Sequence, residues 1–269
     1  MSLKRTVKET LIRLLAPHGY TLTRLDAAPP SPPPPVPAPV APAPLVATPS
    51  VAPIEPMDAG LGDILKRKLA FKTIIDIGAS DGRWTAMALR HFPDHDYLLV
   101  EAQPVHIPAL ETFRATRPRV QLALAAAGEK PGTINFDATD PFGGIASEHP
   151  FPSNNIIVPV TTLDHEVRAR KLQGPFLIKF DTHGFEVPIL NGTSETLEQT
   201  EVIVMECYNF RIAPPCLLFH EMCALLEKKG FRCIDLVDPI RRPLDNCLWQ
   251  MDLVFARNSR SEFSQPRYQ

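Results

Sequence analysis

Two carboxylates and two glycines stand at spacings that could bind a nucleoside-containing cofactor. Asp76 lies near the end of an apolar run, and Gly78 and Gly82 follow it, so the backbone there can turn tightly and approach a ligand closely. Glu101 ends the next apolar run, 19 residues after Gly82. In a nucleotide-binding strand–helix–strand unit, a carboxylate at that place accepts hydrogen bonds from both hydroxyls of a ribose. The spacing therefore favours a cofactor site, with glycines that serve only local packing as the alternative.

The same spacing also distinguishes between cofactors. A dinucleotide fingerprint needs glycines at positions 78, 80 and 83, but this chain has Ser80 and Arg83 at the last two. A nicotinamide-dependent oxidoreductase is therefore disfavoured. The pattern Asp-x-Gly-x-x-x-Gly fits S-adenosylmethionine better, because that molecule has a ribose and an amino-acid tail but no phosphate. The carboxylates of Asp76 and Asp81 suit its sulfonium and ammonium charges.

A second group of polar residues could contact the molecule that is modified. The apolar run 176–181 predicts a strand that brings Asp181 and His183 to the carboxyl edge of a sheet, where open α/β sheets bind their ligands. Because an imidazole titrates near neutral pH, His183 could accept a proton from a substrate hydroxyl; it could equally cap or pack a loop. Glu206 ends the following strand and has the same positional argument with less support.

Alternating strands and helices are predicted to position these residues. Short apolar runs alternate with longer helical stretches, which is typical of βαβ units and a mostly parallel sheet. The first half of the pattern has strands over 73–78, 97–101 and 120–126, and helices over 61–69, 84–91 and 107–116. The second half has strands over 176–181 and 202–206, and helices over 187–197 and 217–229.

Two further pairs of strands have no helix between them. The first pair, 133–136 and 156–161, is predicted to form an insertion, and the residues around 136–156 are expected to shape the acceptor pocket. The second pair, 231–236 and 248–255, is predicted to lie antiparallel at one edge of the sheet. The fold class is therefore α/β, with a central, mostly parallel sheet, helices on both faces and an antiparallel strand pair at one edge.

Proline divides the chain into parts. Thirteen of the 30 prolines fall between positions 29 and 56, which predicts a disordered linker because proline disrupts helices and central strands. Residues 1–28 contain five basic and two acidic side chains, a net charge of +3, and an amphipathic helix is predicted over 2–16. We expect one α/β domain over 57–258 and a flexible tail over 259–269.

Charge and cysteine content limit which partners and which cellular compartment are expected. The net charge of −2 gives no general attraction to nucleic acid, so no nucleic-acid partner is expected. Five cysteines without a C-x-x-C pair indicate reduced thiols and a cytoplasmic protein. No signal peptide or transmembrane segment is predicted, and peripheral membrane contact through residues 2–16 stays open. The sequence does not indicate an oligomeric state.

Taken in order, the motifs resemble those of FkbM-type methyltransferases, which are class I and S-adenosylmethionine-dependent. The resemblance extends over roughly 73–257, and its matching stretches are 75–82, 100–104, 125–129, 160–164, 179–192 and 250–255. The chain departs from the family's common residues at two positions. It has Ser80 where the family often has asparagine, and His183 where the family often has glutamate or glutamine.

This resemblance implies a Rossmann-like methyltransferase domain over 57–258. The expected reaction is transfer of the methyl group of S-adenosylmethionine to a hydroxyl of a small molecule or glycan, such as a sugar or a secondary-metabolite scaffold. The implied cofactor contacts are Asp76, Gly78, Ala79, Ser80, Gly82 and Glu101, and the implied catalytic residues are Asp181 and His183. No metal is predicted, because no compact ligand cluster stands out in the sequence, although some methyltransferases position their hydroxyl with Mg²⁺.

A non-catalytic interaction module is the alternative from a different functional class. A degenerate fold of the same kind would then be tethered by the proline-rich linker. In that case Asp76 and Glu101 could be exchanged for alanine without any change in cofactor affinity.

Overall fold

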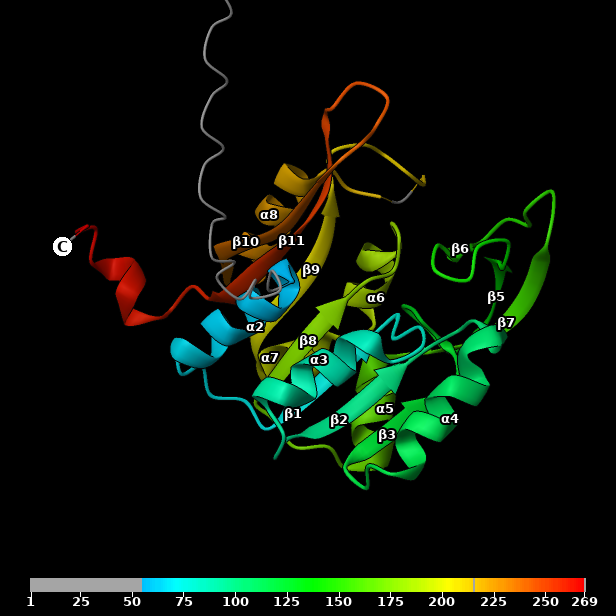
Figure 1. The fold of residues 1–269 in the computed structure, drawn as a ribbon, viewed down its shortest axis with the longest axis horizontal. Helices are drawn as coiled ribbons and strands as arrows, with labels where there is room; N and C mark the ends of the chain where they lie inside the picture. The colour runs from blue at the N-terminus through cyan, green and yellow to red at the C-terminus, as the bar shows by residue number, and fades with distance from the viewer. Residues whose placement is uncertain (1–54, 215, 269) are drawn as a thin grey trace, which may run out of the picture. The chain divides into compact units, whose positions relative to one another are not determined.

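A seven-stranded sheet lies at the centre of the computed structural model, which describes residues 55–214 and 216–268 (Figure 1). The strands lie in the order β10-β11-β9-β8-β1-β2-β3. Their bounds are Thr73–Ile77 for β1, Asp96–Val100 for β2, Val120–Ala123 for β3, Phe176–Phe180 for β8, Thr200–Tyr208 for β9, Phe231–Arg241 for β10 and Leu248–Arg257 for β11. Strand β11 is antiparallel to both of its neighbours, and the other pairs are parallel. The predicted mostly parallel sheet with an antiparallel strand pair at one edge is confirmed.

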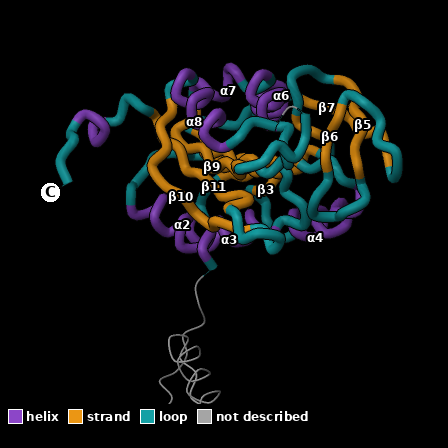
Figure 2. Tube along the Cα trace, turned by 90° about the horizontal axis from the view of Figure 1, so that it is seen from above, coloured by secondary structure: helices purple, strands orange, loops and turns teal. Residues whose placement is uncertain are grey.

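Helices cover both faces of this sheet (Figure 2). One face packs against α2 (Pro56–Lys66), α3 (Arg83–His91) and α4 (Ile107–Ala115); the other packs against α5 (Leu163–Arg170), α6 (Glu186–Asn191), α7 (Ser194–Glu198) and α8 (Phe219–Lys228). Every residue of β1 and β8 is buried as a result. Two apolar cores, one on each face, therefore fix the central strands whose carboxyl ends carry the candidate site residues.

A second, four-stranded sheet forms the predicted insertion, beside the carboxyl edge of the first. Its order is β4-β7-β5-β6, and its strands are Ala126–Ala127, Asn155–Thr161, Gly132–Asp137 and Ile145–Ser147 in that order. The stretch predicted as one strand over 120–126 is thus divided between two sheets: β3 joins the central sheet, and β4 pairs with β7. The short strand β6 was not predicted.

Two helical features differ from the sequence prediction. Helix α5 was not predicted, because only two of its eight residues, Leu163 and Val167, are large and apolar. The helix predicted over 187–197 is two short helices, α6 and α7, with Gly192 after the first. A β-carbon at Gly192 would lie 2.1 Å from the carbonyl oxygen of Gly128, so this turn needs glycine to pass the neighbouring loop.

The helix predicted over 2–16 and the linker up to residue 54 lie outside the described residues, and the domain boundaries stay predictions. The described elements run from Pro56 to a short 3-10 helix at Ser261–Ser264. Within the described part of the chain, every helix is too short or too polar to cross a membrane.

Asp164 joins α5 to α7, and its removal is expected to lower stability. Its carboxylate accepts hydrogen bonds from the backbone N–H groups of Glu195 (3.1 Å) and Thr196 (2.8 Å), at the start of α7. We expect Asp164→Ala to cost about 1–2 kcal/mol of unfolding free energy, the usual value of such a cap. Thermal unfolding should show a fall of about 2–4 °C per kcal/mol. Glu195→Gln, which alters only the exposed ion pair between Glu195 of α7 and Arg168 of α5, is the control and should change little.

Candidate active site

The loop after β1 lies tightly against the end of β8. Gly78 has a backbone φ of +76°, and a β-carbon there would lie 1.9 Å from the carbonyl oxygen of Asp181. Ser80 also has a positive φ, of +52°, and Gly82 has one of +86° where α3 begins. Only a residue without a side chain fits at Gly78, so the predicted glycine turn is a steric requirement of the β1–β8 pairing.

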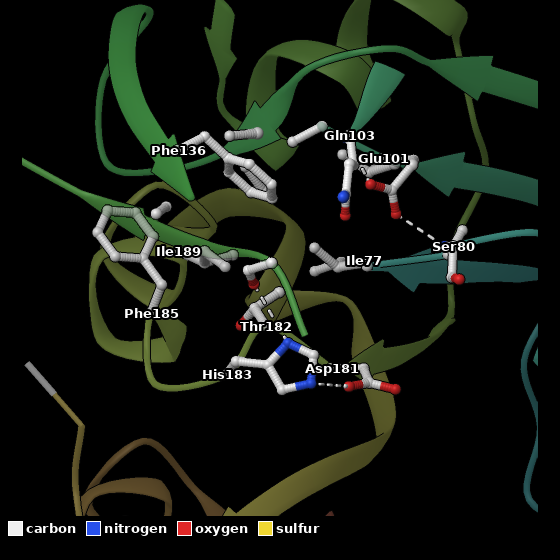
Figure 3. A pocket seen from close by; sticks show the side chains of 18 of the residues that line it. Ile77, Ser80, Glu101, Gln103, Phe136, Asp181, Thr182, His183, Phe185 and Ile189 are labelled. Atoms are coloured by element: carbon white, nitrogen blue, oxygen red, sulfur yellow. Dashed lines mark hydrogen bonds and ion pairs between the residues drawn. The ribbon is translucent and has the colours of Figure 1, made fainter. Parts of the chain in front are cut away.

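Glu101 connects this loop to the loop after β2. One of its carboxylate oxygens accepts a hydrogen bond from the backbone N–H of Ser80 (2.7 Å), and the other accepts one from the N–H of Gln103 (2.6 Å) (Figure 3). The side chain is buried but still lines the cavity described next. Each carboxylate oxygen has a second lone pair, so Glu101 can hold both loops and also accept a hydrogen bond from a ligand.

A cavity of about 240 Å³ opens between these loops and the end of β8. The predicted residues that line it are Gly78, Ala79, Ser80, Glu101, Asp181 and His183. Asp76 and Gly82 are not part of its lining.

The side chain of Asp76 is fully buried behind the loop, where one of its oxygens accepts a hydrogen bond from the Thr85 hydroxyl (2.6 Å). Burial raises the pKa of Asp76, and the nearby Lys179 opposes this. Asp76 therefore bonds to α3 through Thr85 and does not contact the cavity itself.

Charged side chains gather on one side of the cavity, at the ends of β8 and β9. The Lys179 ammonium donates a hydrogen bond to one oxygen of Asp181 (2.5 Å). The Nε2 atom of His183 lies 3.6 Å from the other oxygen of Asp181 (Figure 3). It also lies 3.9 Å from an oxygen of Glu206. His183 has a backbone φ of +50°, a conformation that few non-glycine residues adopt. The two predicted catalytic residues are thus brought together, and Glu206 joins them.

The carboxylates of this group influence one another. Burial raises the pKa of Glu206 well above its ordinary value, and the negative charge of Asp181 adds to the effect. Glu206 accepts hydrogen bonds from the Tyr208 hydroxyl (2.6 Å) and from the side-chain amide of Gln250. Burial also raises the pKa of Asp252, on the neighbouring β11, to about 7, with Lys179 opposing it. The region therefore holds more negative than positive groups.

The insertion closes one side of the cavity, through the segment between β5 and β6. Pro141, Phe142 and Gly144 of this segment line the cavity. Gln103 donates a side-chain hydrogen bond to the Asp140 carbonyl (3.2 Å), and a ring nitrogen of His106 lies 2.6 Å from the Pro141 carbonyl. Sequence reasoning placed the acceptor pocket in this insertion but did not identify Gln103 or His106.

Three ligand-type atoms converge at the charged group. One atom each from Asp181, His183 and Glu206 lies within 4.8 Å of the others, a set that could hold a metal ion. The sequence prediction of no metal rested on the absence of a compact motif. Glu206 lies on a separate strand, so only the pairing of β8 with β9 brings it to the other two.

The chain matches one protein family and is similar to several solved structures. Residues 76–233, more than half of the chain, match the family model described as methyltransferase FkbM domain. Solved structures are similar at low identity. They include the fibrillarin pre-rRNA processing protein of Methanococcus jannaschii (14% identity, 77% of this chain and 77% of that chain, TM-score 0.46). Another is the N-terminal domain of EvdMO1 in the presence of SAH and D-fucose (10% identity, 76% and 83%, TM-score 0.44).

A third similar structure is the Burkholderia thailandensis 1,6-didemethyltoxoflavin-N1-methyltransferase (15% identity, 76% of this chain and 79% of that chain, TM-score 0.41). No curated protein matches the sequence. The family match places the fold among class I methyltransferases, and S-adenosylmethionine is the cofactor. The cavity fits this cofactor, because a backbone without a side chain at Gly78 and the carboxylate of Glu101 meet at its wall.

Proposed function

The chain belongs to the FkbM methyltransferase family, and we propose that it transfers the methyl group of S-adenosylmethionine to a hydroxyl oxygen of a sugar, a glycan or a secondary-metabolite scaffold. The observation that carries this proposal is the placement of Asp181 and His183 on one side of the cavity, opposite apolar residues such as Phe136 and Ile189 (Figure 3). A hydroxyl must lose its proton during methylation, and these polar groups are suited to bind it while it does so.

The residues of this chain would divide the work between cofactor and acceptor. When bound, S-adenosylmethionine supplies an electrophilic methyl group on a positively charged sulfur. The backbone at Gly78 and the Glu101 carboxylate bind its nucleoside and amino-acid parts. The acceptor hydroxyl would donate its hydrogen bond to Asp181 or His183, and this contact would orient its oxygen toward the methyl group. The cofactor would supply the methyl group and leave as a neutral thioether, while the hydroxyl proton would pass through Asp181 and His183 to solvent.

An acceptor screen tests the proposal. The full chain is incubated with methyl-labelled S-adenosylmethionine and neutral sugars, glycans or phenols, with amines and RNA as comparison acceptors. Label in a methyl ether, identified by mass spectrometry, is the expected outcome. Label found only in N-methyl products would contradict a hydroxyl acceptor, and a chain that binds no cofactor in calorimetry would fit the interaction module instead.

Exchange of Glu101 for glutamine is expected to weaken cofactor binding by about 10- to 100-fold, because a charged hydrogen bond contributes about 1.5–3 kcal/mol. The amide nitrogen of glutamine would also face a backbone N–H of Ser80 or Gln103, leaving one donor without an acceptor. Calorimetric titration with S-adenosylmethionine measures the change. The matched control is Glu111→Gln, which alters a surface ion pair on α4.

A ligand comparison tests the role of Glu101 directly. The affinity loss caused by Glu101→Gln should shrink for an S-adenosylhomocysteine analogue that lacks both ribose hydroxyls, as in a double-mutant cycle. An equal loss for both ligands would mean that Glu101 acts only on the loops.

A further inference from the structure

We propose that Asp181, His183 and Glu206 form a binding site for a divalent cation, which holds the acceptor hydroxyl in the cavity. This inference rests on the proposed function for the use of the cation, but the binding itself can be measured without any methyl transfer. If the cation is bound there, Asp181 and His183 act on the acceptor hydroxyl through the cation and not directly.

The distances between the three side chains suit a single ion. Nε2 of His183 lies 3.6 Å from an oxygen of Asp181 and 3.9 Å from an oxygen of Glu206, and all three ligand atoms lie within 4.8 Å of one another. Around an octahedral ion with bonds of about 2.1 Å, ligands lie about 3 Å apart when adjacent and about 4.2 Å apart when opposite. Small side-chain rotations would therefore bring the three atoms to bonding distance.

Strand pairing places further charge on the same face of the sheet. Asp252 of β11 pairs directly with Glu206 of β9, and Lys179 of β8 pairs with Val204, two residues before Glu206. Because side chains alternate along a strand, Lys179, Asp181, Glu206 and Asp252 all point to one face. Asp76 of β1 pairs with Lys179, so the ligand set is part of a row of charges across four neighbouring strands.

The charges in this row do not balance. When ionised, the carboxylates of Asp76, Asp181, Glu206 and Asp252 contribute four negative charges, and Lys179 contributes one positive charge, so negative charge is in excess. The Lys179 ammonium bonds to one oxygen of Asp181, and His183 lies beside the other; Glu206 receives hydrogen bonds from the neutral groups of Tyr208 and Gln250. Buried charge is costly unless it is paired. A divalent cation beside Asp181 and Glu206 would offset part of this negative charge, which is an argument independent of the distances.

The donor set and its access indicate the class of ion. Two carboxylate oxygens and one imidazole nitrogen suit Mn²⁺, and Mg²⁺ or Zn²⁺ are the nearest competitors. Asp181 and His183 line the cavity, so the remaining coordination positions face the space where an acceptor would lie. A cation there would bind the hydroxyl oxygen and make its proton easier to lose.

Binding of Mn²⁺ alone to the chelator-treated full chain tests the site. Electron paramagnetic resonance should detect one bound Mn²⁺ per chain. Glu206→Gln and Asp181→Asn should each weaken binding by more than about tenfold, since even loss of an outer-shell partner costs about 10- to 100-fold. Asp245→Asn removes a carboxylate from a surface ion pair on the β10–β11 hairpin, and it should leave Mn²⁺ binding unchanged. His183→Asn is a third ligand variant, in case a carboxylate variant does not fold by circular dichroism.

Each result supports or overturns the proposal. No binding at about 1 mM Mn²⁺, the weak end of protein sites for divalent ions, would overturn it. Binding that all ligand variants retain would also overturn it, because the ion would lie elsewhere. If Mn²⁺ binds as expected but no hydroxyl acceptor is methylated, the proposed function fails while the cation site stands. If methylation proceeds at an equal rate after chelation, the role of the cation in holding the acceptor hydroxyl is overturned while the proposed function stands.

Discussion

Gly78→Ala is expected to remove detectable S-adenosylmethionine binding and to destabilise the protein by more than about 3 kcal/mol. Two separate costs combine at this position. A φ of +76° disfavours any residue with a side chain, by about 1–2 kcal/mol. The new β-carbon would also lie 1.9 Å from the carbonyl oxygen of Asp181, and a backbone atom can move away only if the end of β8 moves with it. That movement would displace the cavity wall on both the cofactor side and the acceptor side.

Two other glycines separate these costs. Gly82 has a positive φ of +86°, but its β-carbon would meet only side chains at ordinary contact distance, 3.5 Å from Leu110 and Phe113. Gly82→Ala should therefore cost only the conformational part, about 1–2 kcal/mol. Gly132 has open space around it, so Gly132→Ala should be nearly neutral. Thermal unfolding and calorimetric titration with the cofactor measure the series. If Gly78→Ala behaved like Gly82→Ala in both, the close approach of the two backbones would not be important for the site.

The sequence predicted the features that depend on near neighbours in the chain. The glycine loop and the strand end at Glu101 follow from local spacing, and both lie at the cavity. The reason that Gly78 must be glycine could not be predicted, because the atom that excludes a side chain belongs to Asp181 on another strand. The hydrogen bond from the Ser80 backbone to Glu101 likewise depends on how two loops meet in space.

Long-range pairing explains what was missed around the acceptor side. Glu206 had only a positional argument in the sequence, and its place beside His183 follows from the pairing of β8 with β9. Asp76 is the opposite case: its position in the motif predicted a cofactor contact, and in the structure its side chain points into the buried interior and bonds to Thr85. A strand end can present a side chain to the cavity or to the core, and the sequence pattern alone does not decide which.

Exchange of His183 for asparagine is expected to lower kcat by about 10²- to 10⁴-fold, the usual contribution of a group that assists proton loss. Asparagine is chosen because it tolerates the left-handed backbone conformation, with φ of +50°, better than most residues. The imidazole is then lost without added strain. The affinity for S-adenosylmethionine should stay within about twofold, because the Glu101 and Gly78 contacts are unchanged, and a factor of two is only about 0.4 kcal/mol.

The control for this exchange is His220→Ala, on the exposed side of α8, which should leave turnover unchanged. Turnover of the labelled acceptor and calorimetric titration of the cofactor are measured on the same preparations. A fall in kcat with intact cofactor affinity would assign His183 to the acceptor side of the reaction, because a residue that only packs the loop would change both together. Full activity of His183→Asn would exclude the imidazole from the reaction, and the acceptor hydroxyl would then have to be bound by Asp181 alone.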